Sequence, residues 1–130
     1  MPLLTMALSL GWMGMAMSAD LAGGHWRPST ITTESLAPET PIYVAFSEDG
    51  KVTGFGGCNR FFGGYTIEGN SIKIGPLAST RKGCPDTLNL EVEFFKALQE
   101  AVTFEQTETA LVLFGPGGDK LAELIHTDNT

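Results

Sequence analysis

Apolar and polar residues alternate in several short segments of the chain, a pattern typical of half-buried β-strands. In residues 42–46, the apolar side chains at alternate positions share one face. Asp49 and Gly50 form a strong hairpin signal, so residues 51–55 are predicted to return antiparallel. Two further hairpins and one short strand are predicted in the same way: residues 65–67 with 71–74, residues 110–114 with 120–125, and residues 77–80. Short strands with glycine-rich turns at this spacing predict a sandwich or a barrel.

One segment departs from this rhythm and predicts a helix. Between Asp86 and Val102 the chain has neither glycine nor proline, and apolar residues recur at helical spacing. Pro85 and Asp86 stand where a helix start favours a breaker and a cap. The predicted apolar face consists of Val92, Phe95, Leu98 and Val102, flanked by Phe94 and Ala101, and the predicted polar face of Glu93, Lys96, Gln99 and Glu100. We expect the apolar face to cover the open side of the sheet.

The first 19 residues carry no charge, are strongly apolar and end in the small residues Ser18 and Ala19. A run of this kind is typical of a secretory signal peptide, here cleaved after Ser18 or Ala19. Because no lysine or arginine precedes Arg27, we expect the natural signal to begin upstream of Met1. An uncleaved anchor is the alternative, since the run approaches the ~20 residues of a membrane span.

These patterns divide the chain into four parts. We expect a signal peptide over residues 1–19, a linker over 20–25, a folded domain over 26–125 and a polar tail over 126–130. No cysteine follows the apolar run, so lipid anchoring is not indicated. The sequence therefore predicts an exported protein, either periplasmic or secreted.

The charge balance narrows the classes of partner. Lysine and arginine number 8 against 15 aspartate and glutamate residues, which gives a formal net charge of −7. Nucleic acids bind to basic faces, so the acidity argues against a nucleic-acid partner. We interpret the acidity as a contribution to solubility and expect a monomer.

The chain contains two cysteines, Cys58 and Cys84. In an exported protein, an even number of cysteines predicts a disulfide. In the chain-entropy description, closing a loop of this length contributes roughly 3.5 kcal/mol. A zinc site with His25 and His126 is a weaker alternative, because these four residues lack the paired local spacing of zinc ligands. A catalytic thiol at Cys58 would require a free thiolate, which oxidation removes.

The surroundings of the cysteines resemble a known family. The motifs are Gly57-Cys58-Asn59-Arg60 with Gly64-Tyr65, then Leu77-Ala78-Ser79-Thr80-Arg81 with Cys84-Pro85, then Glu91, Phe95 and Leu98. In this order and spacing they resemble the META domain family, which includes HslJ-like heat-shock proteins, from Trp26 to about Leu124. The resemblance implies a mostly β (α+β) fold, a small cracked antiparallel β-barrel with one helix packed across it. It also implies an exported protein of the bacterial envelope, associated with stress tolerance and without an established enzymatic activity.

Polar residues beside the cysteines form the candidate site: Asn59, Arg60, Thr80, Arg81 and Glu91. In a structural interpretation, Arg60 or Arg81 pairs with Glu91 or Asp86. Asn59 then holds a turn through its side-chain amide. In a functional interpretation, the same residues form a small basic patch for an anionic partner. The structural interpretation is favoured, because a semi-buried arginine needs a carboxylate and suitable ones lie nearby.

The glycine-rich bend also carries four aromatic residues: Phe55, Phe61, Phe62 and Tyr65. They fill the barrel interior or line a pocket for an apolar ligand, and small barrels are usually filled by side chains. We therefore expect a non-enzymatic domain in envelope stress tolerance or protein interaction, whose partner is an envelope protein or a lipid. The alternatives are a β-barrel carrier of a hydrophobic ligand and a thiol-dependent enzyme at Cys58. No cofactor or metal is expected.

Overall fold

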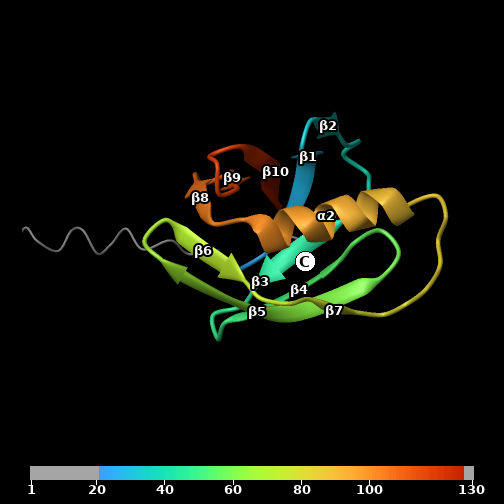
Figure 1. Ribbon diagram of the computed structural model, residues 1–130, viewed down its shortest axis with the longest axis horizontal. Coiled ribbons are helices and arrows are strands. Elements are labelled where there is room, and N and C mark those ends of the chain that lie inside the picture. Colours follow the sequence, from blue (N-terminus) through green and yellow to red (C-terminus); the bar gives the residue numbers. More distant parts are fainter. Residues whose placement is uncertain (1–20, 128–130) are drawn as a thin grey trace, which may run out of the picture.

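The structure, a computed structural model, describes residues 21–127 (Figure 1). Ten strands and one helix are found in this part of the chain. Their bounds are β1 His25–Ile31, β2 Glu34–Ser35, β3 Tyr43–Phe46, β4 Lys51–Phe55, β5 Arg60–Glu68, β6 Ser71–Ile74, β7 Ala78–Ser79, α2 Leu88–Glu100, β8 Thr103–Gln106, β9 Ala110–Phe114 and β10 Lys120–Thr127.

Eight of the strands close into an antiparallel barrel. Their hydrogen-bonded order is β10-β9-β8-β6-β5-β4-β3-β1, and β1 pairs in turn with β10. The closing pair runs from His25 opposite Thr127 to Ile31 opposite Ala122. The short strands β2 and β7 are added to β1 and β5. The first and last described strands therefore lie side by side and complete the barrel.

Two seams in the barrel are only thinly paired. Strands β6 and β8 share one paired position, Ser71 opposite Thr103, and strands β1 and β3 share one, Trp26 opposite Val44. Helix α2 packs across the barrel against β1, β6, β9 and β10 (Figure 1). The prediction of a cracked antiparallel barrel with one helix across it is confirmed.

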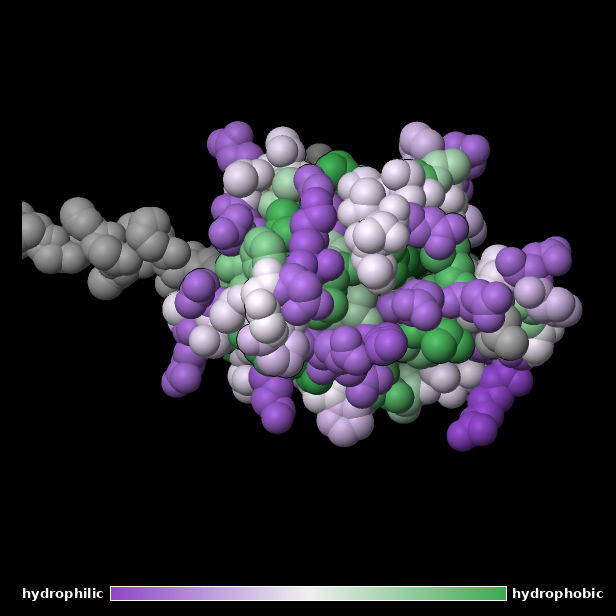
Figure 2. All heavy atoms as spheres, turned by 45° about the horizontal axis from the view of Figure 1, so that its top comes forward, coloured by the Kyte–Doolittle hydropathy of each residue, from purple (hydrophilic) through white to green (hydrophobic). Residues whose placement is uncertain are grey.

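Apolar side chains fill the barrel interior. The largest fully buried ones are Trp26, Phe61 and Phe94, and Phe61 meets Phe94 and Phe95 edge to face at centroid distances of 6.0 and 5.1 Å. Trp26 Nε1 donates a hydrogen bond to the carbonyl of Leu21 at 3.1 Å, so the buried indole is satisfied. The outside is mixed, and Figure 2 shows hydrophilic and hydrophobic residues interleaved on one face.

The three predicted hairpins are all present. Opposite positions in them include Phe46 with Val52, and the second and third hairpins pair β5 with β6 and β9 with β10. In the first turn Gly50 has φ +88°, a conformation that glycine adopts without strain. The Ser47 hydroxyl donates a hydrogen bond to the Asp49 carboxylate, which holds the pKa of that carboxyl below its ordinary value.

Two barrel strands, β1 and β8, were not predicted, because their patterns of apolar and polar residues are weak. Strand β1 contains Pro28, and its register with β10 shifts between Pro28 and Thr30, so its alternation is broken. Proline within a strand normally argues against a strand. Strand β8 buries a single apolar side chain, Phe104. Strand β1 owes its place to β10, far away in the sequence, whereas β8 pairs mainly with β9, the next strand along the chain.

The helix is found where it was predicted, but its buried face is rotated. The side chains against the barrel are those of Glu91, Phe94, Ala97, Leu98 and Ala101, whereas Val92 is 52% exposed and Val102 is 40% exposed. The helix starts after Thr87 and ends at Glu100, and Ala101 is already extended. Val102 therefore lies beyond the helix. The predicted polar residues on the helix are exposed as expected.

The rotated face gives a testable result for Val92. Replacing Val92 by lysine is expected to change the free energy of unfolding by less than about 0.5 kcal/mol, because the side chain already faces water. Chemical denaturation of the wild type and the variant measures the difference. A loss of several kcal/mol would place Val92 in the core and contradict the described helix orientation.

The folded part extends beyond the expected domain limits at both ends. In the expected linker, residues 20–25, the side chain of Leu21 is 1% exposed and joins the core. In the expected tail, His126 and Thr127 belong to β10, because β1 pairs with them. Apolar burial and barrel closure thus recruit residues that look like linker and tail in the sequence. The expected signal peptide, residues 1–19, lies outside the described residues.

Across residues 21–127, no helix has both the length and the apolar character needed to span a membrane.

Candidate functional site

The two cysteines join the bend after β4 to the segment before helix α2. Cys58 and Cys84 form a disulfide with their Cα atoms 5.9 Å apart, across a sequence separation of 26 residues. The bend at residues 56–59 is thereby fixed against residues 80–84. We call this region, with Asn59, Thr80 and Glu91, the disulfide end of the barrel.

Glu91 is the buried centre of the disulfide end. Its side chain is 4% exposed, and it lies in the first turn of α2. One carboxylate oxygen, Oε2, accepts hydrogen bonds from the backbone N–H groups of Cys58 at 3.1 Å and Asn59 at 2.6 Å. The other oxygen, Oε1, accepts from Asn59 Nδ2 at 2.9 Å. A carboxylate at a helix N-terminus is also favoured by the helix dipole. Glu91 therefore ties the helix start to the bend.

Asn59 continues this network to the opposite segment. Its side-chain oxygen accepts hydrogen bonds from the Thr80 hydroxyl at 2.8 Å and from the Lys82 backbone N–H at 2.7 Å. Its side-chain nitrogen donates to the Lys82 carbonyl at 3.2 Å as well as to Glu91. Asn59 is 5% exposed, and every polar atom of its amide is used. It holds the bend through its side-chain amide.

Two glycines let the bend approach the helix so closely. A Cβ atom on Gly56 would lie 2.7 Å from Cγ and 2.8 Å from Oε2 of Glu91. Gly57 has φ +109°, a conformation that side-chain-bearing residues rarely adopt. The glycine-rich sequence before Cys58 is therefore explained by contact with Glu91 and by one positive φ.

The arginines of the candidate site lie outside this network. Arg60 and Arg81 are exposed. Among residues 21–127, ion pairs are formed by Lys51 with Asp49 and by Lys120 with Glu123. The expected pair of Arg60 or Arg81 with Glu91 or Asp86 is thus not formed. Both oxygens of Glu91 accept hydrogen bonds from N–H donors of Cys58 and Asn59 instead, and Asp86 is exposed. Only the backbone of Arg60 takes part, through hydrogen bonds with Thr80.

The zinc site and the catalytic thiol, the two alternatives that use the cysteines, both need sulfur atoms that are not bonded to each other. Both cysteines of the chain are in the disulfide. In this state neither sulfur can serve as a thiolate nucleophile or a zinc ligand. Within residues 21–127, no three histidine, cysteine or acidic residues gather as a metal site would require.

The four aromatic residues of the bend divide between core and surface. Phe61 is 1% exposed and belongs to the core, whereas Phe62 is 53% exposed. Phe55 and Tyr65 are half-buried. The set therefore does not form one interior pocket.

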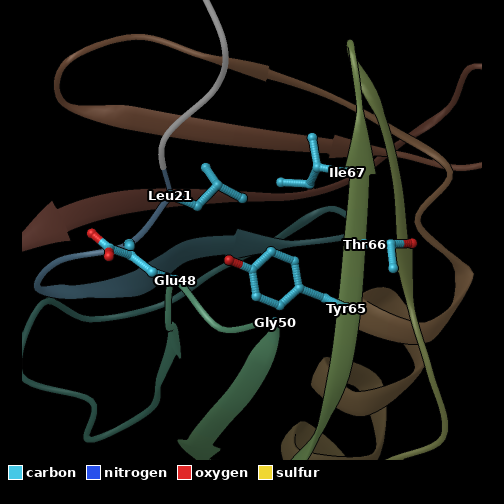
Figure 3. A pocket seen from close by; sticks show the side chains of 7 residues that line it. Leu21, Glu48, Gly50, Tyr65, Thr66 and Ile67 are labelled. Carbon is cyan, nitrogen blue, oxygen red and sulfur yellow. The ribbon is translucent and has the colours of Figure 1, made fainter.

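Tyr65 lines a depression of about 350 Å³ outside the core (Figure 3). Its lining comprises Leu21, Ala22, Glu48, Gly50, Tyr65, Thr66 and Ile67. The Tyr65 ring projects from β5 into this space, and its hydroxyl donates to the Ser47 carbonyl at 2.7 Å. The same ring meets Phe46 edge to face at 4.9 Å. Its hydroxyl and ring thus serve the fold itself.

A second depression, of about 400 Å³, lies on β1, β3 and β4. We call it the aromatic pocket and define it by His25, Arg27, Tyr43, Phe55 and Thr127. In the sequence, His25 stands far from Phe55, which belongs to the glycine-rich bend. These residues come from both ends of the chain and from two central strands, so no local pattern could have grouped them.

Solved structures of other proteins have a similar fold. A DUF4847 family protein from Bacteroides vulgatus has a TM-score of 0.66 at 17% identity, covering 85% of this chain and 96% of that chain. A protein studied by NMR has a TM-score of 0.62 at 22% identity, with coverages of 79% and 89%. One from Burkholderia xenovorans, also studied by NMR, has 0.58 at 23%, with coverages of 82% and 84%. Identities this low support likeness of fold alone.

Fold and site together define a class, the small antiparallel β-barrel that is closed by its terminal strands, crossed by a helix and braced by a disulfide. The sequence profile of the META domain matches residues 19–126, and the chain belongs to the META domain family. The family resemblance noted in the sequence is confirmed. None of the curated proteins compared with the chain matches it.

Proposed function

We propose that this protein is an exported META domain that acts by non-covalent binding in the cell envelope, in stress tolerance or protein interaction. The Cys58–Cys84 disulfide is the observation that carries the proposal. Structural disulfides persist in oxidising compartments and are rare in the cytosol. The apolar run over residues 1–19 is a second argument for export.

The chemistry of the disulfide end favours binding over catalysis. The carboxylate of Glu91 is buried there and accepts three N–H hydrogen bonds, which give it a structural role. The two sulfur atoms are bonded to each other. The side chains of three cations remain exposed there, Arg60, Arg81 and Lys82, and are available to an anionic partner.

Fractionation of the source cells tests the export part of the proposal. We expect the protein outside the cytoplasm, with a mature N-terminus created by cleavage after Ser18 or Ala19. Alkylation without reductant, followed by mass spectrometry, is expected to leave Cys58 and Cys84 unmodified. A cytoplasmic protein with two alkylated thiols would contradict the proposal.

Photo-crosslinking in envelope extract under oxidising conditions tests the binding part. Mass spectrometry for both proteins and lipids should identify one envelope protein, captured in an amount nearly equal to that of the META-domain protein. Arg60→Gln with Arg81→Gln is expected to reduce this capture, whereas Lys120→Gln, which removes a cation outside the disulfide end, is the matched control. Capture of a lipid without protein would favour the carrier alternative, and equal capture by all variants would exclude the arginines as the contact.

A further inference from the structure

The positive charges of the protein are concentrated in one stretch of the barrel. Residues 51–82, which comprise β4 to β7 and the start of the following loop, contain 5 of the 8 lysine and arginine residues but 1 of the 15 aspartate and glutamate residues, Glu68. The five cations are all exposed: Lys51, Arg60, Lys73, Arg81 and Lys82. A chain with a net charge of −7 thus has one basic region, and nearly all of its acidic residues lie elsewhere in the sequence.

Strand β5 turns one of these cations and an aromatic ring to the outside of the barrel. Phe61 points inward, where it meets Phe94 and Phe95 of helix α2 edge to face. Because side chains alternate along a strand, Arg60 and Phe62 on either side of it point away from the helix. Both of these side chains are exposed.

The neighbouring strands add two cations to the same outer surface. Val52 in β4 and Ile72 in β6 are buried in the core, so Lys51 and Lys73 beside them point outward. Strand pairing places β4 and β6 on the two sides of β5. We call this outer surface the basic face and define it by Lys51, Arg60, Phe62 and Lys73.

Phe62 stands out from the basic face. The residues directly opposite it are Thr53 in β4 and Ala78 in β7, and the next outward position along β5 is Gly64. Because these neighbours are small, they leave the Phe62 side chain 53% exposed. The other large apolar side chains that are exposed in residues 21–127 belong to other parts of the fold: Val92, Val102 and Ile125. The basic face therefore offers one apolar ring among cations.

This composition fits the surface of an anionic bilayer. Sites that bind at a membrane surface combine apolar side chains, which enter the boundary between headgroups and acyl chains, with cations that are attracted to anionic lipids. A stable protein interface, by contrast, has a core of several apolar residues and buries about 800 Å² on each partner. Because the basic face has a single exposed ring, contact with lipid explains the face better than an extended protein interface.

The acidity of the rest of the protein does not cancel this attraction. Charges more than a Debye length apart, about 8 Å at physiological ionic strength, are largely screened from each other. Lys51 is partly neutralised, since its Nζ lies 4.0 Å from a carboxylate oxygen of Asp49. Arg60 and Lys73 form no ion pair within residues 21–127, so their charges remain available.

We propose that the basic face binds the surface of an anionic lipid bilayer. The ring of Phe62 enters the boundary between headgroups and acyl chains, and the side chains of Lys51, Arg60 and Lys73 contact lipid phosphates. Binding is peripheral and reversible and involves no covalent step. The inference goes beyond the envelope protein partner proposed above, with which it shares Arg60, and a test on vesicles without protein lets the two proposals fail separately.

Co-sedimentation with vesicles tests the proposal on the mature chain, isolated from cells with its disulfide intact. Anionic vesicles contain equal amounts of phosphatidylglycerol and phosphatidylcholine, and neutral vesicles contain phosphatidylcholine alone. We expect a partition coefficient at least about tenfold larger for the anionic vesicles, since each cation near an anionic surface strengthens binding about fivefold. Raising the salt concentration from about 0.1 to about 1 M should remove most of this difference, because the Debye length falls from about 10 to 3 Å. Equal binding to both kinds of vesicle, or no binding to the anionic ones, would overturn the proposal.

Two variants with matched controls locate the contact. Phe62→Thr keeps a strand-forming residue but removes the ring, and it is expected to lower the partition coefficient about fivefold or more. Its control is Ile125→Thr, which removes an exposed apolar side chain from β10 and should leave binding unchanged. Lys73→Gln is expected to cost about fivefold, whereas Lys96→Gln, at an exposed position of α2, should cost nothing. Unchanged binding in either variant of the basic face, or equal losses in the controls, would overturn the proposal.

Tryptophan fluorescence reports on the ring itself. Besides Trp12 in the expected signal peptide, the chain contains Trp26, which is 2% exposed. Phe62→Trp introduces an exposed indole, and we expect its emission to shift to shorter wavelength when anionic vesicles are added, because the indole leaves water for the headgroup boundary. Unchanged emission from vesicle-bound protein would mean that another face contacts the membrane, which would overturn the proposal.

Discussion

Reducing the Cys58–Cys84 disulfide is expected to lower the free energy of unfolding by about 3.5 kcal/mol, because the unfolded chain regains the freedom of the 26-residue separation that the bond closes. For a domain of this size, that corresponds to a fall in Tm of about 15–25 °C. The loss is a large share of the ~5–15 kcal/mol that a small domain has in total. Thermal unfolding with and without reductant measures it.

The variant Cys84→Ser removes the disulfide with little loss of packing, because Cys84 is only half-buried. Cys58, by contrast, is 6% exposed. The Tm of Cys84→Ser should equal that of the reduced wild type and should not respond to reductant. The hydrogen bond from the backbone N–H of Cys58 to Glu91 remains in this variant. If reductant leaves the wild type's Tm unchanged, the bond does not brace the domain.

Glu91→Gln is expected to cost about 3 kcal/mol of unfolding free energy, although it changes one atom. Both carboxylate oxygens face donors: the N–H groups of Cys58 and Asn59 on one side and Asn59 Nδ2 on the other. A glutamine has one oxygen, so in either orientation its NH₂ group faces a donor. Asn59 cannot turn its amide to compensate without losing the bonds from Thr80 and Lys82.

Glu93→Gln is the matched control, because Glu93 lies two residues further along α2 and is exposed. It removes the same charge, and its expected effect is below about 0.5 kcal/mol. Urea unfolding of the two variants at the same pH and ionic strength makes the comparison. Similar small effects for both variants would mean that the Glu91 network contributes little to stability.

Short-range signals explain what the sequence predicted well. The first hairpin follows from alternation in residues 42–46 and from Asp49-Gly50, all within about ten residues. The helix position follows from a segment without glycine or proline. Its buried face was misjudged because Val92 and Val102 are apolar but solvent-exposed. Periodicity cannot separate an exposed apolar residue such as Val92 from core residues on the same short helix, nor show that the helix ends before Val102.

Three of the five candidate residues share one hydrogen-bond network. Asn59, Thr80 and Glu91 lie together beside the disulfide, whereas the side chains of Arg60 and Arg81 are exposed outside the network. The sequence suggested an arginine as the partner of Glu91, because charge pairs can be recognised from residue types. Backbone N–H donors cannot, since every residue except proline has one. Only the path of the bend through Gly56 and Gly57 determines that these donors reach the carboxylate.

The sequence by itself determined the hairpins, the position of the helix and the pair of cysteines, because each depends on turn residues, periodicity or residue type within a short stretch. The tertiary structure decided that β1 closes the barrel on β10, where Trp26 is opposite His126, and that Leu21 belongs to the core. It also assembled the aromatic pocket from three strands. These features depend on contacts between residues up to a hundred positions apart, whose energies appear only when the chain has folded.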